Sequence, residues 1–204
     1  MKAIVKNEHH SLLLEQYLPL IKKLTRSSKL NAKQSCVLDL ACGTGRNGRY
    51  LLDQGVDVCF ADINSNVLKE IEESIGLQSK GSDTTKKTKQ GSSTFWQVDF
   101  EEEGSLPLQG KRFAGIIVFR YLHRALFEQI KKAIIPGGFI IYETFTVDNR
   151  EFGRPNNPNF LLEKGELTDI FSGWKVEYDF EGVVGQSDPK TKQAIAQIIA
   201  TKVQ

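Results

Sequence analysis

The segment VLDLACGTGRNGRYLL, residues 37–52, joins an apolar run that favours a buried strand to a helical pattern through a glycine-rich turn. Glycine tolerates positive φ and leaves room for a ligand beside the backbone. Gly43, Gly45 and Gly48 have the G-x-G-x-x-G spacing of dinucleotide-binding loops, and a strand before and a helix after are the context which that spacing requires. A glycine turn that binds nothing remains the alternative at this point.

Strand-like and helical segments alternate along the rest of the chain. Strands are expected over residues 36–41, 56–62, 93–99, 113–119, 137–145, 174–182 and 192–203, and helices over 45–55, 64–76 and 124–134. This alternation predicts a parallel sheet with helices on both faces, and the short loop between the last two strands predicts an antiparallel hairpin at one edge. We therefore expect one α/β domain over residues 1–204, with a Rossmann-like, doubly wound, mostly parallel seven-stranded sheet and an antiparallel C-terminal strand hairpin.

Three segments lie outside this alternation. Residues 11–24 have apolar positions at helical spacing, which predicts an N-terminal helical extension over 1–30 that kinks or splits at Pro19. Residues 78–93 lack large apolar side chains and are rich in lysine, which predicts a flexible surface insertion or, alternatively, a basic binding arm. Residues 146–167 combine Asn, Pro and Gly with Phe152 and Phe160, which is typical of an ordered loop, and we expect a substrate lid there.

Two aspartates indicate the kind of ligand that the glycine turn would bind. Asp62 ends the second strand, and in a parallel sheet it would arrive beside the turn, where a carboxylate can accept hydrogen bonds from both hydroxyls of a ribose. It could instead cap the next helix, although Asn64 and Ser65 are available for that. Asp39 would be unfavourable beside a pyrophosphate and favourable near a cationic group, or it could bind backbone amides of the turn. Together they favour a ribose-bearing ligand with a cationic end.

With these residues, the sequence resembles the class I S-adenosylmethionine-dependent methyltransferases. Residues 39–45, DLACGTG, match their first motif, with Ala41 where glycine is most common, and residues 134–143, IIPGGFIIYE, match their proline-glycine-glycine turn before the fifth strand. The resemblance is strong over residues 36–143 and loose at both ends. CGTGRNGRYL, RYLHRALFEQI and PGGFIIYETFT are most similar to the small tellurite-resistance-type methyltransferases, which act on small molecules where their substrates are known.

The resemblance implies that S-adenosylmethionine is the cofactor and that its methyl group passes to a small-molecule acceptor by in-line displacement. It places Asp62 at the ribose, Asp99 at the adenine amino group and Phe100 against the adenine ring. The full set of residues implied for cofactor binding is Asp39, Ala41, Gly43, Gly45, Asn47, Asp62, Ile63, Asp99, Phe100 and Phe119.

Catalytic candidates follow the fourth and fifth strands, because ligands in this kind of sheet bind beyond the carboxyl ends of the strands. Tyr121 and His123 are the protic side chains expected near the transferred methyl group, and Glu143 could orient the acceptor. Each of these residues could instead have a structural role. Three arginines could hold an anionic acceptor or simply lie on the surface: Arg120, Arg124 and Arg154.

Composition restricts the partners. A net charge of +2 gives no support for a dedicated duplex-nucleic-acid protein, and no apolar run approaches the roughly 20 residues of a membrane span. Three cysteines are expected as reduced thiols in a cytoplasmic protein, and no metal site is expected from the three histidines. An RNA or protein acceptor, a non-catalytic donor-binding module and a nicotinamide-dependent oxidoreductase remain alternatives. The RNA alternative depends on the lysine-rich insertion and on a basic patch at Lys22, Lys23, Arg26, Lys29 and Lys33.

Overall fold

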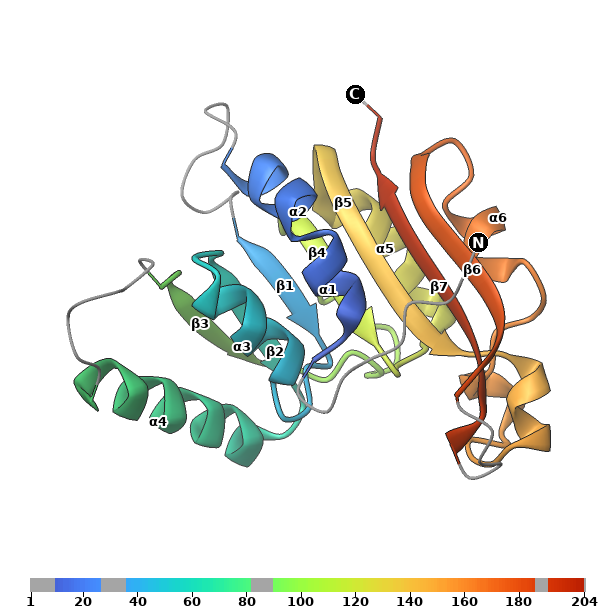
Figure 1. Cartoon of the computed structure of the whole chain (residues 1–204), viewed down its shortest axis with the longest axis horizontal. Helices are drawn as coiled ribbons and strands as arrows, with labels where there is room; N and C mark the ends of the chain where they lie inside the picture. The colour runs from blue at the N-terminus through green and yellow to red at the C-terminus, as the bar shows by residue number, and fades with distance from the viewer. Residues whose placement is uncertain (1–9, 27–35, 82–89, 186–190, 204) are drawn as a thin grey trace.

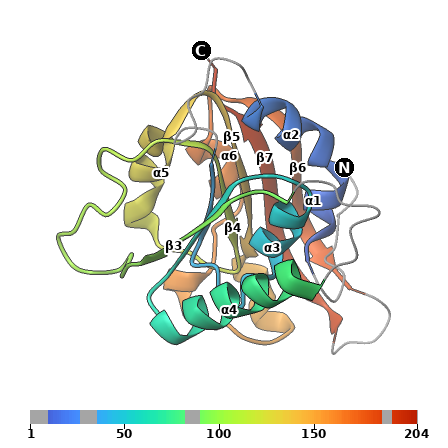
Figure 2. The ribbon, with the colours of Figure 1, turned by 90° about the vertical axis from the view of Figure 1, so that its left-hand side faces the viewer.

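The computed structural model describes residues 10–26, 36–81, 90–185 and 191–203. They form three layers, with one seven-stranded sheet between two layers of helices (Figures 1 and 2). The strands lie in the order β3-β2-β1-β4-β5-β7-β6. Their bounds are β1 Val37–Leu40, β2 Val58–Asp62, β3 Ser93–Gln97, β4 Phe113–Phe119, β5 Ile134–Phe145, β6 Lys175–Val184 and β7 Gln193–Thr201.

Strands β1 to β5 are parallel, whereas β7 is antiparallel to β5 and β6 is antiparallel to β7. The predicted fold class, including the C-terminal antiparallel hairpin, is therefore confirmed. The chain inserts β7 between β5 and β6, so the last strand in sequence is not the edge of the sheet. Because β7 has a neighbouring strand on each side, its residues 194–200 are all buried.

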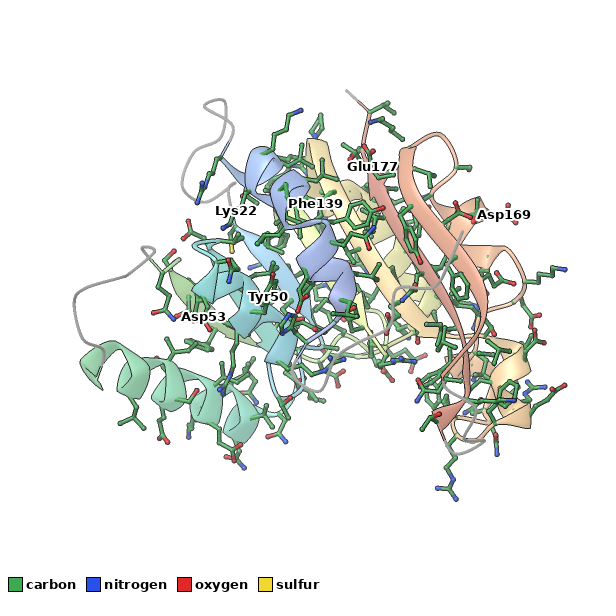
Figure 3. The ribbon with its side chains drawn as sticks, viewed as in Figure 1. Lys22, Tyr50, Asp53, Phe139, Asp169 and Glu177 are labelled. Atoms are coloured by element: carbon green, nitrogen blue, oxygen red, sulfur yellow. The ribbon has the colours of Figure 1, made fainter. Side chains whose placement is uncertain are left out.

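Helices cover both faces of the sheet, as the edge-on view shows (Figure 2). One face packs against α1 Leu12–Gln16, α2 Leu18–Thr25, α3 Arg46–Asp53 and α4 Ser65–Gly81. The other face packs against α5 Phe127–Ala133 and α6 Glu166–Ile170. On the first face, Phe139 of β5 lies beside α2 (Figure 3), and its ring fills the space over Gly115, where an added Cβ would be 2.3 Å from the ring.

The N-terminal helical segment splits as expected. Helix α1 ends at Gln16 and α2 begins at Leu18, with Pro19 in its first turn, where a proline needs no hydrogen-bond donor. Ser11 caps α1 by accepting from the Leu13 N–H. Residues 27–35, which include Lys29 and Lys33 of the predicted basic patch, lie outside the described residues.

The first residues of the predicted surface insertion are helical instead. Helix α4, which Asn64 caps by accepting from the Asn66 and Val67 N–H groups, continues to Gly81, so residues 78–81 are helical. No proline interrupts the sequence there, and a helix once formed adds residues at little further cost. Strand β3 begins at Ser93, and residues 82–89 lie outside the described part of the chain.

The helix expected over residues 124–134 is shorter in the structure, and the proline-glycine-glycine turn expected before the fifth strand lies within that strand. A 3-10 turn, η1 Arg124–Leu126, precedes α5, and α5 already ends at Ala133. The three residues lie within β5, where its register with β4 shifts. Glycine is required at this irregularity, because a Cβ on Gly138 would be 2.5 Å from the Ala114 carbonyl oxygen and Gly137 has a φ of 78°.

Candidate active site

The candidate site lies at the carboxyl edge of the parallel strands. The chain crosses to opposite sides of β1 to form β2 and β4, so the strand order reverses between β1 and β4, which is where open α/β sheets bind ligands. The glycine turn follows β1, Asp62 ends β2, and Arg120 and Tyr121 follow β4.

The three glycines of the turn have different roles. An added Cβ would be 2.7 Å from the Ile71 side chain at Gly45 and 2.4 Å from the Phe60 ring at Gly48, so these two glycines allow α3 to pack closely. At Gly43, whose φ is 51°, an added Cβ would meet no described atom within 4 Å. Ala41 also has a positive φ of 51°, which explains why glycine is usual at its position. The backbone at Gly43 is therefore open to a ligand.

Asp62 is held firmly beside this opening. Its Oδ2 accepts from the Gly43 N–H and its Oδ1 from the Asn64 N–H, both at 2.9 Å. Each carboxylate oxygen can accept more than one hydrogen bond, so the pair remains able to accept from two ribose hydroxyls. Because Asn64 caps α4, Asp62 is not needed as the cap. Next to it, the Ile63 side chain is 59% exposed and offers an apolar surface.

Asp39 and Asn47 are buried beside the glycine turn and bind backbone N–H groups. Asp39 is buried and its Oδ2 accepts from the Gly48 N–H at 2.9 Å, so it binds the amide of the turn, as the alternative interpretation proposed. Burial raises the pKa of this carboxyl to about 8. Asn47 is buried too, and its Oδ1 accepts from the Ser11 N–H at 2.9 Å, which ties the N-terminal segment to the turn. The side chains of both residues are thus engaged within the protein.

Of the two residues predicted to contact the adenine, one is exposed and the other is buried. Asp99 is exposed, with its Oδ1 accepting from the Glu101 N–H at 2.8 Å. Phe100, in contrast, is 5% exposed and packs edge-to-face on Trp96, and Phe119 is also a core residue. The expectation that Phe100 flanks a ligand ring does not agree with this packing, and Ile63 is the large apolar side chain of the predicted set that is exposed.

A hollow of about 340 Å³ lies beyond β4 and β5. Tyr121 is half-buried there, and burial together with Glu101 raises the pKa of its hydroxyl. His123 is not among the residues that line the hollow. Those residues are Glu101, Arg120, Tyr121, Leu122, Thr144, Phe145, Pro155 and Phe160.

Glu143 does not face this hollow directly but is fully buried beneath it. Its Oε2 accepts from Gln197 Nε2 at 2.6 Å, and its Oε1 lies 3.1 Å from Arg120 Nη2. The Tyr178 hydroxyl donates to Gln197 Oε1 at 3.0 Å, so a buried polar chain extends from β6 across β7 to β5. Glu143 therefore holds Arg120 instead of orienting an acceptor itself. Gln197 was not predicted, although a lone glutamine in the apolar run AIAQIIA is a sequence signal for a buried polar contact.

The expected lid loop is ordered and fastened to the domain. Arg124 forms a bidentate pair with Glu166, at 2.7 and 2.8 Å, and donates to the Leu161 carbonyl at 2.8 Å. Arg124 is thus a clamp on the loop, and Phe160 of the same loop lines the hollow. The loop contains two 3-10 turns, η2 Val147–Glu151 and η3 Pro158–Phe160.

No helix in the described ranges combines the length and the apolar character that crossing a membrane requires. Among the same residues, no three His, Cys, Asp or Glu side chains are grouped so that they could hold a metal ion. Cys36, Cys42 and Cys59 are free thiols.

Comparison with known proteins identifies the class. TehB from Haemophilus influenzae superposes with a TM-score of 0.62 and 20% identity, covering 89% of this chain, which spans 62% of TehB. A methyltransferase from Methanosarcina mazei superposes with a TM-score of 0.59 and 15% identity, covering 91% of this chain and 97% of that protein. Magnesium protoporphyrin IX methyltransferase from Synechocystis, crystallised with S-adenosylmethionine, has a TM-score of 0.57, 15% identity and coverages of 93% and 79%. The fold is that of a class I S-adenosylmethionine-dependent methyltransferase.

The family assignment follows from the sequence. A model described as a methyltransferase domain matches residues 13–176, and the chain belongs to this family. No curated protein matches the chain in sequence.

Proposed function

We propose that this methyltransferase transfers a methyl group from S-adenosylmethionine to a small-molecule acceptor that occupies the hollow beyond β4 and β5. The observation that carries the proposal is the fixed Asp62 carboxylate beside the open backbone of Gly43, on the same edge of the sheet as the hollow. A volume of about 340 Å³ is at the lower end of the range for small-molecule pockets. One structural neighbour, the magnesium protoporphyrin IX methyltransferase, is named for a small-molecule acceptor.

The residues present fit the donor. Asp62 would accept from the ribose hydroxyls, the exposed Asp99 would face the adenine amino group, and Ile63 would cover the adenine ring. When bound, S-adenosylmethionine supplies a methyl group that its sulfonium already activates. The protein has to align the acceptor and exclude water.

Tyr121 serves as a hydrogen-bond donor to the acceptor in this proposal. Burial and the neighbouring Glu101 raise the pKa of the phenol, so the hydroxyl stays protonated at neutral pH and cannot be the general base. Phe160 and Pro155 close one side of the hollow against water. The lid role of residues 146–167 belongs to this proposal.

The test compares ligands and then acceptors. S-adenosylmethionine and S-adenosylhomocysteine should raise the melting temperature and NAD should not, since a ligand stabilises only the fold that binds it. Incubation with methyl-labelled donor and a panel of small molecules, proteins and RNA should label a small molecule. Donor binding without any transfer would favour a binding module, and labelling that is confined to RNA and lost at high salt would favour the nucleic-acid alternative.

The cellular compartment of the protein is also part of this proposal. The free thiols of Cys36, Cys42 and Cys59 fit a reducing environment. We assign the protein to the cytoplasm on this basis, and localisation of a tagged chain by microscopy would test it.

A further inference from the structure

Arg120 has an unusual backbone conformation. It is the first residue after β4 and has a φ of 60°, a left-handed conformation that is uncommon for any residue other than glycine. Its N–H donates to the Glu143 carbonyl at 2.8 Å, which holds the backbone in place. Such strained residues persist only where their surroundings determine them, and they cluster at functional sites. The conformation directs an arginine toward the hollow that it helps to line.

The guanidinium group of Arg120 is paired on one edge only. Nη2 forms an ion pair with Glu143 Oε1 at 3.1 Å, in which Oε1 accepts no hydrogen bond from the described residues, and the guanidinium carbon lies 4.4 Å from the centre of the Phe145 ring. Nη1 is buried, and the described residues supply no hydrogen-bond acceptor to it. A buried donor that lacks an acceptor is unfavourable, so a ligand that brings an acceptor to Nη1 gains affinity.

Glu143 is held in place and does not pair with Arg120 Nη1 as well. Its other carboxylate oxygen accepts from Gln197 Nε2 at 2.6 Å, and Gln197 is in turn bound to the Tyr178 hydroxyl at 3.0 Å. Gln197 of β7 and Tyr178 of β6 are both buried. The ion pair between Glu143 and Arg120 therefore fixes the position of the guanidinium group. The planar arrangement of its N–H donors matches the geometry of a carboxylate.

Charges of both signs act on residues that line the hollow. Burial lowers the pKa of Arg120, Glu143 raises it and the nearby Arg46 lowers it, and Arg46 Nη1 is also buried without an acceptor among the described residues. Glu101 and Asp99 act on the Tyr121 hydroxyl. Two arginines against the single carboxylate of Glu143 favour an anion at Arg120, and the acidic residues disfavour one beside Tyr121.

The remaining walls are aromatic. Tyr121, Phe145 and Phe160 line the hollow together with Pro155. Rings of this kind favour a flat apolar ligand body. We infer that the acceptor is a small aromatic carboxylate, whose carboxylate accepts from Arg120 Nη1 and whose ring lies among these side chains. This inference rests on the proposed function and names the chemical class of its acceptor.

The test uses matched pairs of probes on the full chain saturated with S-adenosylhomocysteine. Benzoate, phenylacetate and cinnamate are each compared with the corresponding amide by ligand-observed NMR titration. The carboxylates should bind roughly tenfold more tightly, as expected for a charge-assisted hydrogen-bonded pair. Arg120→Gln should abolish this preference, whereas Arg150→Gln, an exposed arginine of the lid loop that does not line the hollow, should keep it.

The outcomes separate the two proposals. If the Arg120→Gln protein does not fold because Glu143 is left unpaired, the double variant Arg120→Gln/Glu143→Gln, which removes both charges, is used in its place. Equal affinity for carboxylates and amides, binding of neither, or a preference that survives in the variant would overturn this inference while S-adenosylhomocysteine still binds. Failure of S-adenosylhomocysteine to bind would overturn the proposed function itself.

Discussion

Asp62 is the residue on which the proposed donor site depends most directly, and replacing it with alanine is the sharpest test of that proposal. The carboxylate accepts from Gly43 and Asn64 at 2.9 Å and would also accept from two ribose hydroxyls. Hydrogen bonds to a charged group contribute about 1.5–3 kcal/mol each, and water replaces part of this in the variant. A net loss of about 2–4 kcal/mol corresponds to a Kd for S-adenosylhomocysteine that is roughly 30- to 1000-fold higher.

The chain offers a matched control on the same strand. Asp57 precedes β2 at its opposite end, and its Oδ1 also accepts a backbone N–H, that of Ser92, at 2.7 Å. Asp57→Ala loses one such bond and should lower the free energy of unfolding by about 1 kcal/mol or somewhat more, and Asp62→Ala loses two and should lower it by about twice as much. Only Asp62→Ala should weaken the ligand.

Isothermal titration calorimetry with S-adenosylhomocysteine measures the affinity, and urea denaturation measures the stability. A Kd for Asp62→Ala that stays near the wild-type value would refute the ribose assignment. Equal losses of affinity in both aspartate variants would show that the effect arises from general destabilisation.

Three further predictions concern packing, ionisation and the lid loop. Gly48→Ala should lower the free energy of unfolding by about 1–3 kcal/mol in urea denaturation, because the new Cβ would be 2.4 Å from the Phe60 ring; Gly76→Ala, whose Cβ would meet nothing within 4 Å, should not. Asp39→Asn should remove a loss of stability as pH rises from about 4 to 8, because the native carboxyl keeps its proton up to a pKa of about 8 while the unfolded chain releases it near 4. The stability of the variant relative to wild type in urea should therefore grow by about 4–5 kcal/mol over that range, and a constant difference would contradict the assignment. Arg124→Gln should speed limited proteolysis within residues 150–160 by roughly fivefold without changing global stability, because the bidentate pair with Glu166 holds the loop, and unchanged cleavage would mean that the pair contributes little.

The sequence by itself determined the features that depend on local pattern. Alternating apolar runs and helical periodicity are properties of short segments, so they were sufficient to predict the doubly wound sheet, the division of the N-terminal helix close to Pro19 and the hairpin at the end. The glycine turn and Asp62 were predictable for the same reason, since consecutive parallel strands bring their carboxyl ends to one edge.

Only the tertiary structure decided which side chains face the site. Phe100 is buried because Trp96 packs against it, and Glu143 pairs with Arg120 and Gln197 because β7 lies beside β5 and not at the edge of the sheet. Contacts of this kind join residues far apart in the chain, and they depend on strand order and register. A segment read alone does not contain that information, so only the folded protein showed that Arg120, of the three candidate arginines, lines the hollow.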